Sequence, residues 1–91
     1  MNDRNINATA YVVTELEQES NGEKRLAHIS LFAELGNAKK YLHERYDNAR
    51  RNAELGAGVF SADFSDNGWY AVVDNDGDLK EGFLSERTVI Q

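Results

Sequence analysis

Residues 66–77 read DNGWYAVVDNDG, and this stretch decides the fold. Its centre, residues 69–73, is a run of aromatic, β-branched and small apolar residues that favours a β-strand. Asn67-Gly68 and Asp76-Gly77 flank the run, and both pairs suit tight turns whose backbone needs positive φ. The stretch therefore predicts a strand with a tight hairpin turn at each end, which requires an antiparallel sheet.

The segments on either side of this stretch also have strand-like patterns. Residues 59–65 alternate, and the alternation predicts that Phe60, Ala62 and Phe64 point inward. A final strand or bent pair of strands is expected over residues 79–90. The C-terminal third is therefore predicted to hold three strands.

The N-terminal third is predicted to be a hairpin of its own. Residues 8–17 are rich in β-branched and aromatic residues, and Asn21-Gly22 follows as a strong turn pair. Residues 24–32 then alternate. This alternation predicts one face with Ala27, Ile29 and Leu31, and a second face with Leu26, His28, Ser30 and Phe32.

Between these β regions, the apolar period changes to that of a helix. From about Glu34 to Glu54, a stripe at 100° per residue contains Leu35, Ala38, Leu42, Tyr46, Ala49 and Ala53. The small alanines allow a helix to lie close to a sheet. Gly56 and Gly58 follow, and glycine suits the position just past a helix end.

The predicted fold is α+β, with element order ββαβββ in a single domain over residues 1–91. We expect one antiparallel sheet of four to five strands, with the helix packed on one face. Residues 1–7 are expected to form a flexible N-terminus. The second face is expected to be partly open, and its candidates are Tyr11 or Val13, His28, and Trp69 or Tyr70.

The totals limit the class of protein and its compartment. The chain has 91 residues and no cysteine, which fits a reducing compartment, so a cytoplasmic location is expected. No apolar run is long enough for a membrane span or an export signal, so no membrane association is expected. The chain carries a net charge of −6, which argues against direct nucleic-acid binding because such proteins neutralise phosphates with clustered lysine and arginine.

The negative charge is concentrated in the C-terminal third. Residues 55–91 contain seven of the sixteen acids and only two bases. Acids on hairpin tips beside exposed aromatic residues would form a surface for a basic partner. The partner-binding candidates are Asp63, Asp66, Trp69, Tyr70, Asp74, Asp76, Asp78 and Glu81, although these acids could equally serve solubility alone.

No catalytic, cofactor or metal site is predicted. Residues 74–78 place acids in the spacing that begins a calcium loop, but Leu79 and Ser85 stand where that loop needs glycine and glutamate. The two histidines, His28 and His43, lie in no metal-binding or catalytic motif. The chain is therefore expected not to be an enzyme.

Two loose resemblances exist. The YVV segment at residues 11–13, the SLF segment at residues 30–32, and the following Ala38, Tyr41 and Leu42 resemble small proteins of bacteria and their phages. In size, acidity and hairpin content the chain is similar to phage inhibitors such as anti-CRISPR proteins and the uracil-DNA glycosylase inhibitor. Residues 69–77 look like the aromatic-to-turn hairpin of the latter. The resemblance implies a DNA-mimic mechanism without catalysis, and it transfers no functional residue.

Three functions follow as hypotheses. The first is a non-enzymatic protein-binding domain that presents acidic hairpins to a basic partner, such as a nucleic-acid enzyme inhibited by a phage-type protein. The second is a homodimeric structural domain that associates through the open sheet face. A small-molecule or metal-dependent enzyme is a distant third.

Overall fold

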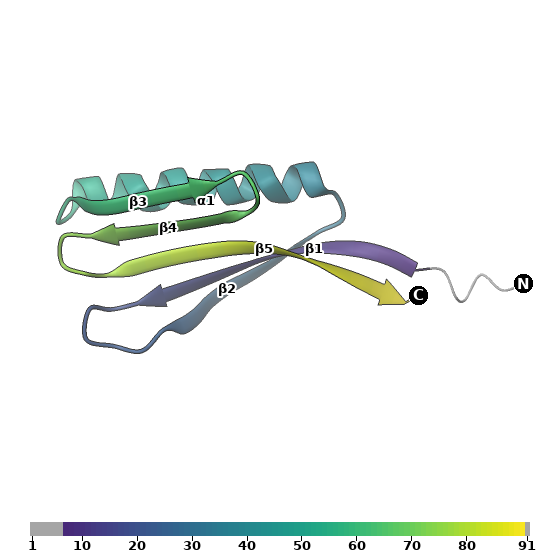
Figure 1. Ribbon diagram of the computed structural model, residues 1–91, viewed down its shortest axis with the longest axis horizontal. Helices are drawn as coiled ribbons and strands as arrows, with labels where there is room; N and C mark the ends of the chain where they lie inside the picture. The colour runs from purple at the N-terminus through teal and green to yellow at the C-terminus, as the bar shows by residue number, and fades with distance from the viewer. Residues whose placement is uncertain (1–6, 91) are drawn as a thin grey trace, which may run out of the picture.

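The computed structural model describes residues 7–90 of the chain. The expected flexible N-terminus lies almost entirely outside the described residues, since β1 begins at Asn7. The elements in chain order are β1 (Asn7–Gln18), β2 (Arg25–Phe32), α1 (Leu35–Leu55), β3 (Val59–Ser65), β4 (Trp69–Asp74) and β5 (Leu79–Ile90). This order and the single helix confirm the predicted α+β fold (Figure 1).

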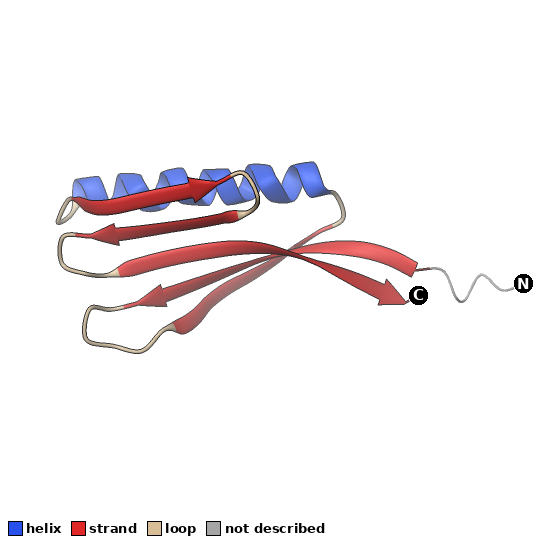
Figure 2. Ribbon diagram, viewed as in Figure 1, coloured by secondary structure: helices blue, strands red, loops and turns tan. Residues whose placement is uncertain are grey.

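All five strands form one antiparallel sheet in the order β2-β1-β5-β4-β3. Strand β5 lies at the centre, where it joins the N-terminal β1–β2 hairpin to the β3–β4 hairpin. Its pairing with β1 runs over the full twelve residues of each strand. Figure 2 shows the result, a single sheet with α1 along one side of it.

The predicted turns are in place. Gly68 and Gly77 have φ of 109° and 88°, values that L-residues with a side chain rarely adopt. The Gly68 amide donates to the Ser65 carbonyl, and the Gly77 amide donates to the Asp74 carbonyl, each at 3.0 Å. These two glycines fix the direction in which β4 enters and leaves the sheet.

The helix packs through most of its predicted stripe. Ala38, Leu42 and Ala49 are buried, and they meet Val13, Tyr70 and Val72 from the sheet. Tyr46 and Ala53 are partly buried against this core, whereas Leu35, in the first turn, is 40% exposed. Gly58, not Gly56, has the positive φ at the helix end, and its amide donates to the Ala53 carbonyl at 2.7 Å.

Two bulges change the faces that simple alternation predicts. In β2 the register with β1 shifts so that Ala27 has no partner, which places Leu26 on the same face as Ile29 instead of opposite it. In β3 a shift between Val59 and Ser61 leaves Phe60 without a partner. Phe60 is 75% exposed, so its predicted inward position is wrong.

The register also assigns the face of each strand. Tyr11 and Val13 lie on the helix side, and His28, opposite Glu15, shares that side. Of the residues considered for the open face, only Trp69 lies there, because Tyr70 is buried under the helix. No helix within residues 7–90 has the length and apolar character to cross a membrane.

Candidate functional site

The side of the sheet opposite α1, called the open face below, is rich in apolar side chains. Leu31, Leu26 and Ile29 of β2 are 72%, 57% and 49% exposed, and Trp69 and Phe83 are each 37% exposed. By the register, the larger apolar residues of the open face include Val12, Leu16, Leu26, Ile29, Leu31, Trp69, Val73, Leu79 and Phe83. Larger contiguous apolar patches on protein surfaces are typical of protein-binding, membrane-binding and ligand-binding sites.

These side chains form continuous rows across the strands. One row runs from Ile29 through Thr14 and Phe83 to Trp69, because each is the direct partner of the next. Partners on one face of an antiparallel sheet lie close enough to touch. The open face is therefore one surface across β2, β1, β5 and β4.

Glu81 is the charged group near the middle of the open face, and its charge is already paired. Trp69 Nε1 donates to Glu81 Oε2 at 2.9 Å, and Lys24 Nζ donates to Glu81 Oε1 at 3.1 Å. Burial raises the pKa of Glu81, but the bonds from Trp69 and Lys24 outweigh it, so the net pKa lies below its ordinary value. Glu81 therefore stays ionised on the face.

The predicted acidic residues do not form one surface. Asp74 is the last residue of β4, and Asp76 and Asp78 lie in the β4–β5 turn, at the end of the molecule where the β1–β2 and α1–β3 loops also lie (Figure 1). Asp66 lies in the β3–β4 turn, at the opposite end of β4 from these three, where it lines a hollow with Lys39 and His43. Asp63 is on the open face of the edge strand β3, opposite Ala71.

The side chains of two of these three aspartates are already hydrogen-bonded within the chain. Asp74 Oδ1 accepts bonds from the Asp76 and Asp78 amides at 2.9 and 3.0 Å. Asp78 Oδ1 accepts a bond from the Ser20 amide at 3.1 Å, which ties the β4–β5 turn to the β1–β2 loop. Asp76 is exposed. Of the three, Asp76 is therefore the best placed to meet a partner.

Tyr70 is a correction to the predicted set, because it is only 2% exposed and cannot anchor a partner. Its ring lies over Gly82 on the neighbouring strand, where an added Cβ would overlap the ring. This glycine lets the Tyr70 hydroxyl reach Glu15 on the next strand along, to which it donates at 3.3 Å. Tyr70 is a core residue with a polar end.

Glu15 is the centre of a polar cluster that sequence reasoning missed. It is 4% exposed, and it accepts bonds from Arg45 Nε at 2.7 Å, Tyr41 Oη at 3.2 Å and Tyr70 Oη. The bond to Glu15 raises the pKa of Arg45, and burial together with the nearby carboxylate raises the pKa of Tyr70. Two features of the sequence could have indicated this cluster. Glu15 follows the buried Val13 by two residues, so it lies on the same face of β1, and Tyr41 and Arg45 are one helical turn apart, so they lie on the same side of α1.

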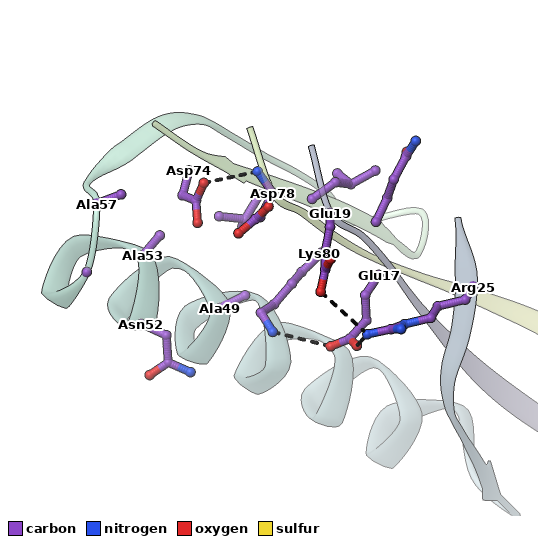
Figure 3. A pocket seen from close by; sticks show the side chains of 14 residues that line it. Glu17, Glu19, Arg25, Ala49, Asn52, Ala53, Ala57, Asp74, Asp78 and Lys80 are labelled. Atoms are coloured by element: carbon purple, nitrogen blue, oxygen red, sulfur yellow. Dashed lines mark hydrogen bonds and ion pairs between the residues drawn. The ribbon is translucent and has the colours of Figure 1, made fainter. Parts of the chain in front are cut away.

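A polar groove opens between the C-terminal half of α1 and the β1–β2 hairpin. One part, about 400 Å³, borders the Glu15 cluster, and His28 lines it. Figure 3 shows the adjoining part, about 250 Å³, with Ala49 and Ala53 on its helix wall. Across it Glu17 is paired with Lys80 at 3.4 Å and with Arg25 at 3.7 Å. Because these charges are paired with one another, the groove does not present a convergent set of groups to a ligand.

The described residues also contain no group of three or more histidine, aspartate or glutamate side chains that could hold a metal ion. Searches against models of protein families, against curated proteins and against solved structures found no significant match to the chain. The proposals below therefore depend on the geometry of the chain itself.

Proposed function

We propose that this chain is a non-enzymatic protein-binding domain and that it binds through the open face of its sheet. The observation that carries the proposal is the set of exposed apolar side chains on the open face, with Leu31 at 72% exposure and Trp69 and Phe83 at 37%. Fully burying a largely exposed side chain such as Leu31 contributes about 1.5–3 kcal/mol, whereas Trp69 and Phe83 contribute only through the 37% that is still exposed. A partner that covers several of them gains enough free energy for stable binding.

Trp69 gives this face an anchor with a defined orientation. Its indole nitrogen is bonded to Glu81, so the ring is held in one position before a partner arrives. Aromatic side chains held in this way lose little conformational freedom on binding, and tryptophan is enriched among the residues that dominate interfaces. Of the two aromatic candidates, Trp69 and Tyr70, Trp69 is therefore the proposed anchor, with Phe83 as its cross-strand partner.

A second candidate surface is the acidic end of the molecule. Asp76 lies there with Glu19 and Glu23, which are also exposed. Such a surface suits a basic partner and a salt-sensitive encounter, as expected for an inhibitor that occupies the basic groove of a nucleic-acid enzyme. For this second surface the partner is still a basic protein, as expected from the sequence, but fewer of the predicted acids take part in binding.

One capture experiment separates the two surfaces. The wild-type chain, Leu31→Lys, the double variant Asp76→Lys/Glu23→Lys, and the control Leu55→Lys are immobilised and exposed to a lysate of the native host. Bound proteins are identified by mass spectrometry at low and moderate salt. Leu55 is 81% exposed at the helix end, away from the open face, so its substitution matches Leu31→Lys in exposure and charge.

We expect the captured proteins to be lost with Leu31→Lys and retained with the other two variants. If the captured proteins are lost only with Asp76→Lys/Glu23→Lys, the binding surface is the acidic end of the molecule. Capture that is unchanged by Leu31→Lys would overturn the assignment to the open face.

A further inference from the structure

We infer that the partner of the open face is a second copy of this chain, packed face to face. The inference rests on the proposed function, because it names the occupant of the same surface. The helix covers one side of the sheet, so two copies joined by their open sides would form a four-layer arrangement of helix, sheet, sheet and helix. Sheets pack in this way at about 10 Å, with interdigitated apolar side chains.

The area of the open face matches what a dimer needs. The five strands contain about 45 residues. With about 3.3 Å per residue and about 4.8 Å between strands, the sheet face covers roughly 700 Å². A standard stable interface buries about 800 Å² on each partner, so the open face is of that size.

The charge on the open face also fits a second copy. The chain as a whole carries −6, so two copies repel each other except where the charge is balanced. Asp63, Glu81 and Arg87 occupy open-face positions, and Lys24 reaches across to Glu81. These two acids and two bases sum to zero, whereas the other surfaces retain the excess acid.

The internal pairing of Glu81 removes the need for a complementary charge from the partner. Glu81 has Trp69 and Lys24 of its own chain as donors, at 2.9 and 3.1 Å. A foreign partner selected by charge would be drawn to the acidic end. The open face is apolar and has no net charge, and Glu81 is already hydrogen-bonded within its own chain. Two copies with the same net charge can therefore bury this face against each other.

Analytical ultracentrifugation of the full chain tests the inference. We expect the wild type to sediment at twice the 10.2 kDa chain mass at micromolar concentration, and 0.5 M NaCl not to weaken the association. Leu31→Lys and Leu26→Lys should each raise the dimer Kd by at least ~100-fold, because a two-fold interface contains every substitution twice. Both side chains are more than half exposed in one copy, so these variants keep the monomer fold.

The control is Leu55→Lys, which changes the net charge by the same amount as Leu31→Lys. Both substitutions bring each copy from −6 to −5 and reduce repulsion, so loss of the dimer in one of them alone cannot come from charge. The Leu55→Lys protein should remain a dimer.

Two results would overturn the inference. A wild-type chain that stays monomeric at ~100 µM excludes the second copy, and the capture experiment then decides separately whether the face binds another protein. A dimer that persists in both Leu31→Lys and Leu26→Lys places the self-association elsewhere and leaves no role for the open face in it.

Discussion

Gly82 controls the packing of Tyr70. The Tyr70 ring lies over the Gly82 backbone, and its hydroxyl continues to the buried carboxylate of Glu15. Any side chain at position 82 would displace the ring from the core and the hydroxyl from its acceptor. A single residue without a Cβ thus links β4, β5 and β1.

Gly82→Ala should destabilise the domain by about 2–3 kcal/mol, because the added methyl group overpacks the core. Urea unfolding at fixed protein concentration measures the change. Gly36→Ala is the matched control, since Gly36 lies in the first turn of α1 with nothing within 4 Å of an added Cβ. This control should be neutral or slightly stabilising, and equal losses in the two variants would contradict the account of Gly82.

Glu15 and Arg45 form an ion pair with unequal burial, which predicts unequal effects of substitution. The side chain of Glu15 is 5% exposed, whereas that of Arg45 is 41% exposed. Arg45→Met leaves a buried carboxylate with only tyrosine donors, which should cost about 3 kcal/mol. Glu15→Met leaves a guanidinium that can return to water, but it also removes the acceptor of the buried Tyr70 hydroxyl, so the cost should be about 1–2 kcal/mol.

Thermal or urea unfolding of the two methionine variants checks this order of stability. The order itself is the test, because both substitutions break the same 2.7 Å contact. If Glu15→Met proved the more damaging change, the cluster would depend on the carboxylate as an acceptor for the tyrosines more than on the pair.

At the scale of elements, the β1–β2 hairpin differs most from its prediction. Strict alternation separates Leu26 from Ile29, but the bulge at Ala27 brings both onto the open face. One extra residue in a strand reverses the facing of everything beyond it. Leu26 therefore joins Ile29 and Leu31 on the open face because of a bulge that no local pattern indicated.

Glu81 connects three elements, since β5 carries it and its donors come from β4 and the β1–β2 loop. Its pKa is lowered in the folded state, so its contribution to stability is present above the ordinary value of 4.5 and is lost as the pH falls through the folded value. Trp69, the single tryptophan, should report this in a fluorescence titration with a midpoint below 4.5. Glu81→Gln should remove the transition while unfolding remains cooperative, and a midpoint above 4.5 would contradict the direction of the shift.

At the scale of the whole molecule, the asymmetry of the two sheet faces is the basis of both proposals. One face is covered by α1, and the other presents Leu31, Trp69 and Phe83 to solvent. Within residues 7–90 no second helix covers the open face. The capture and sedimentation experiments both address this asymmetry, and they distinguish a foreign partner from a second copy.

The sequence by itself determined the element order, the turns at Gly68 and Gly77, and the buried stripe of α1. These follow from local chemistry, because periodicity and positive φ are properties of neighbouring residues. Trp69 was also identified from the sequence as a partner-binding candidate, although the partner-binding role of any residue stays a prediction.

Only the tertiary structure decided which side chains share a face. It placed β5 between β1 and β4, buried Tyr70, and gathered Tyr41 and Arg45 around Glu15. It also divided the predicted acids among one end of the molecule, the β3–β4 turn and the open face. Each of these results depends on strand register and on bulges, which are set by contacts between residues far apart in the chain. Local patterns therefore predicted the strands and the helix, and long-range pairing determined the surface they present.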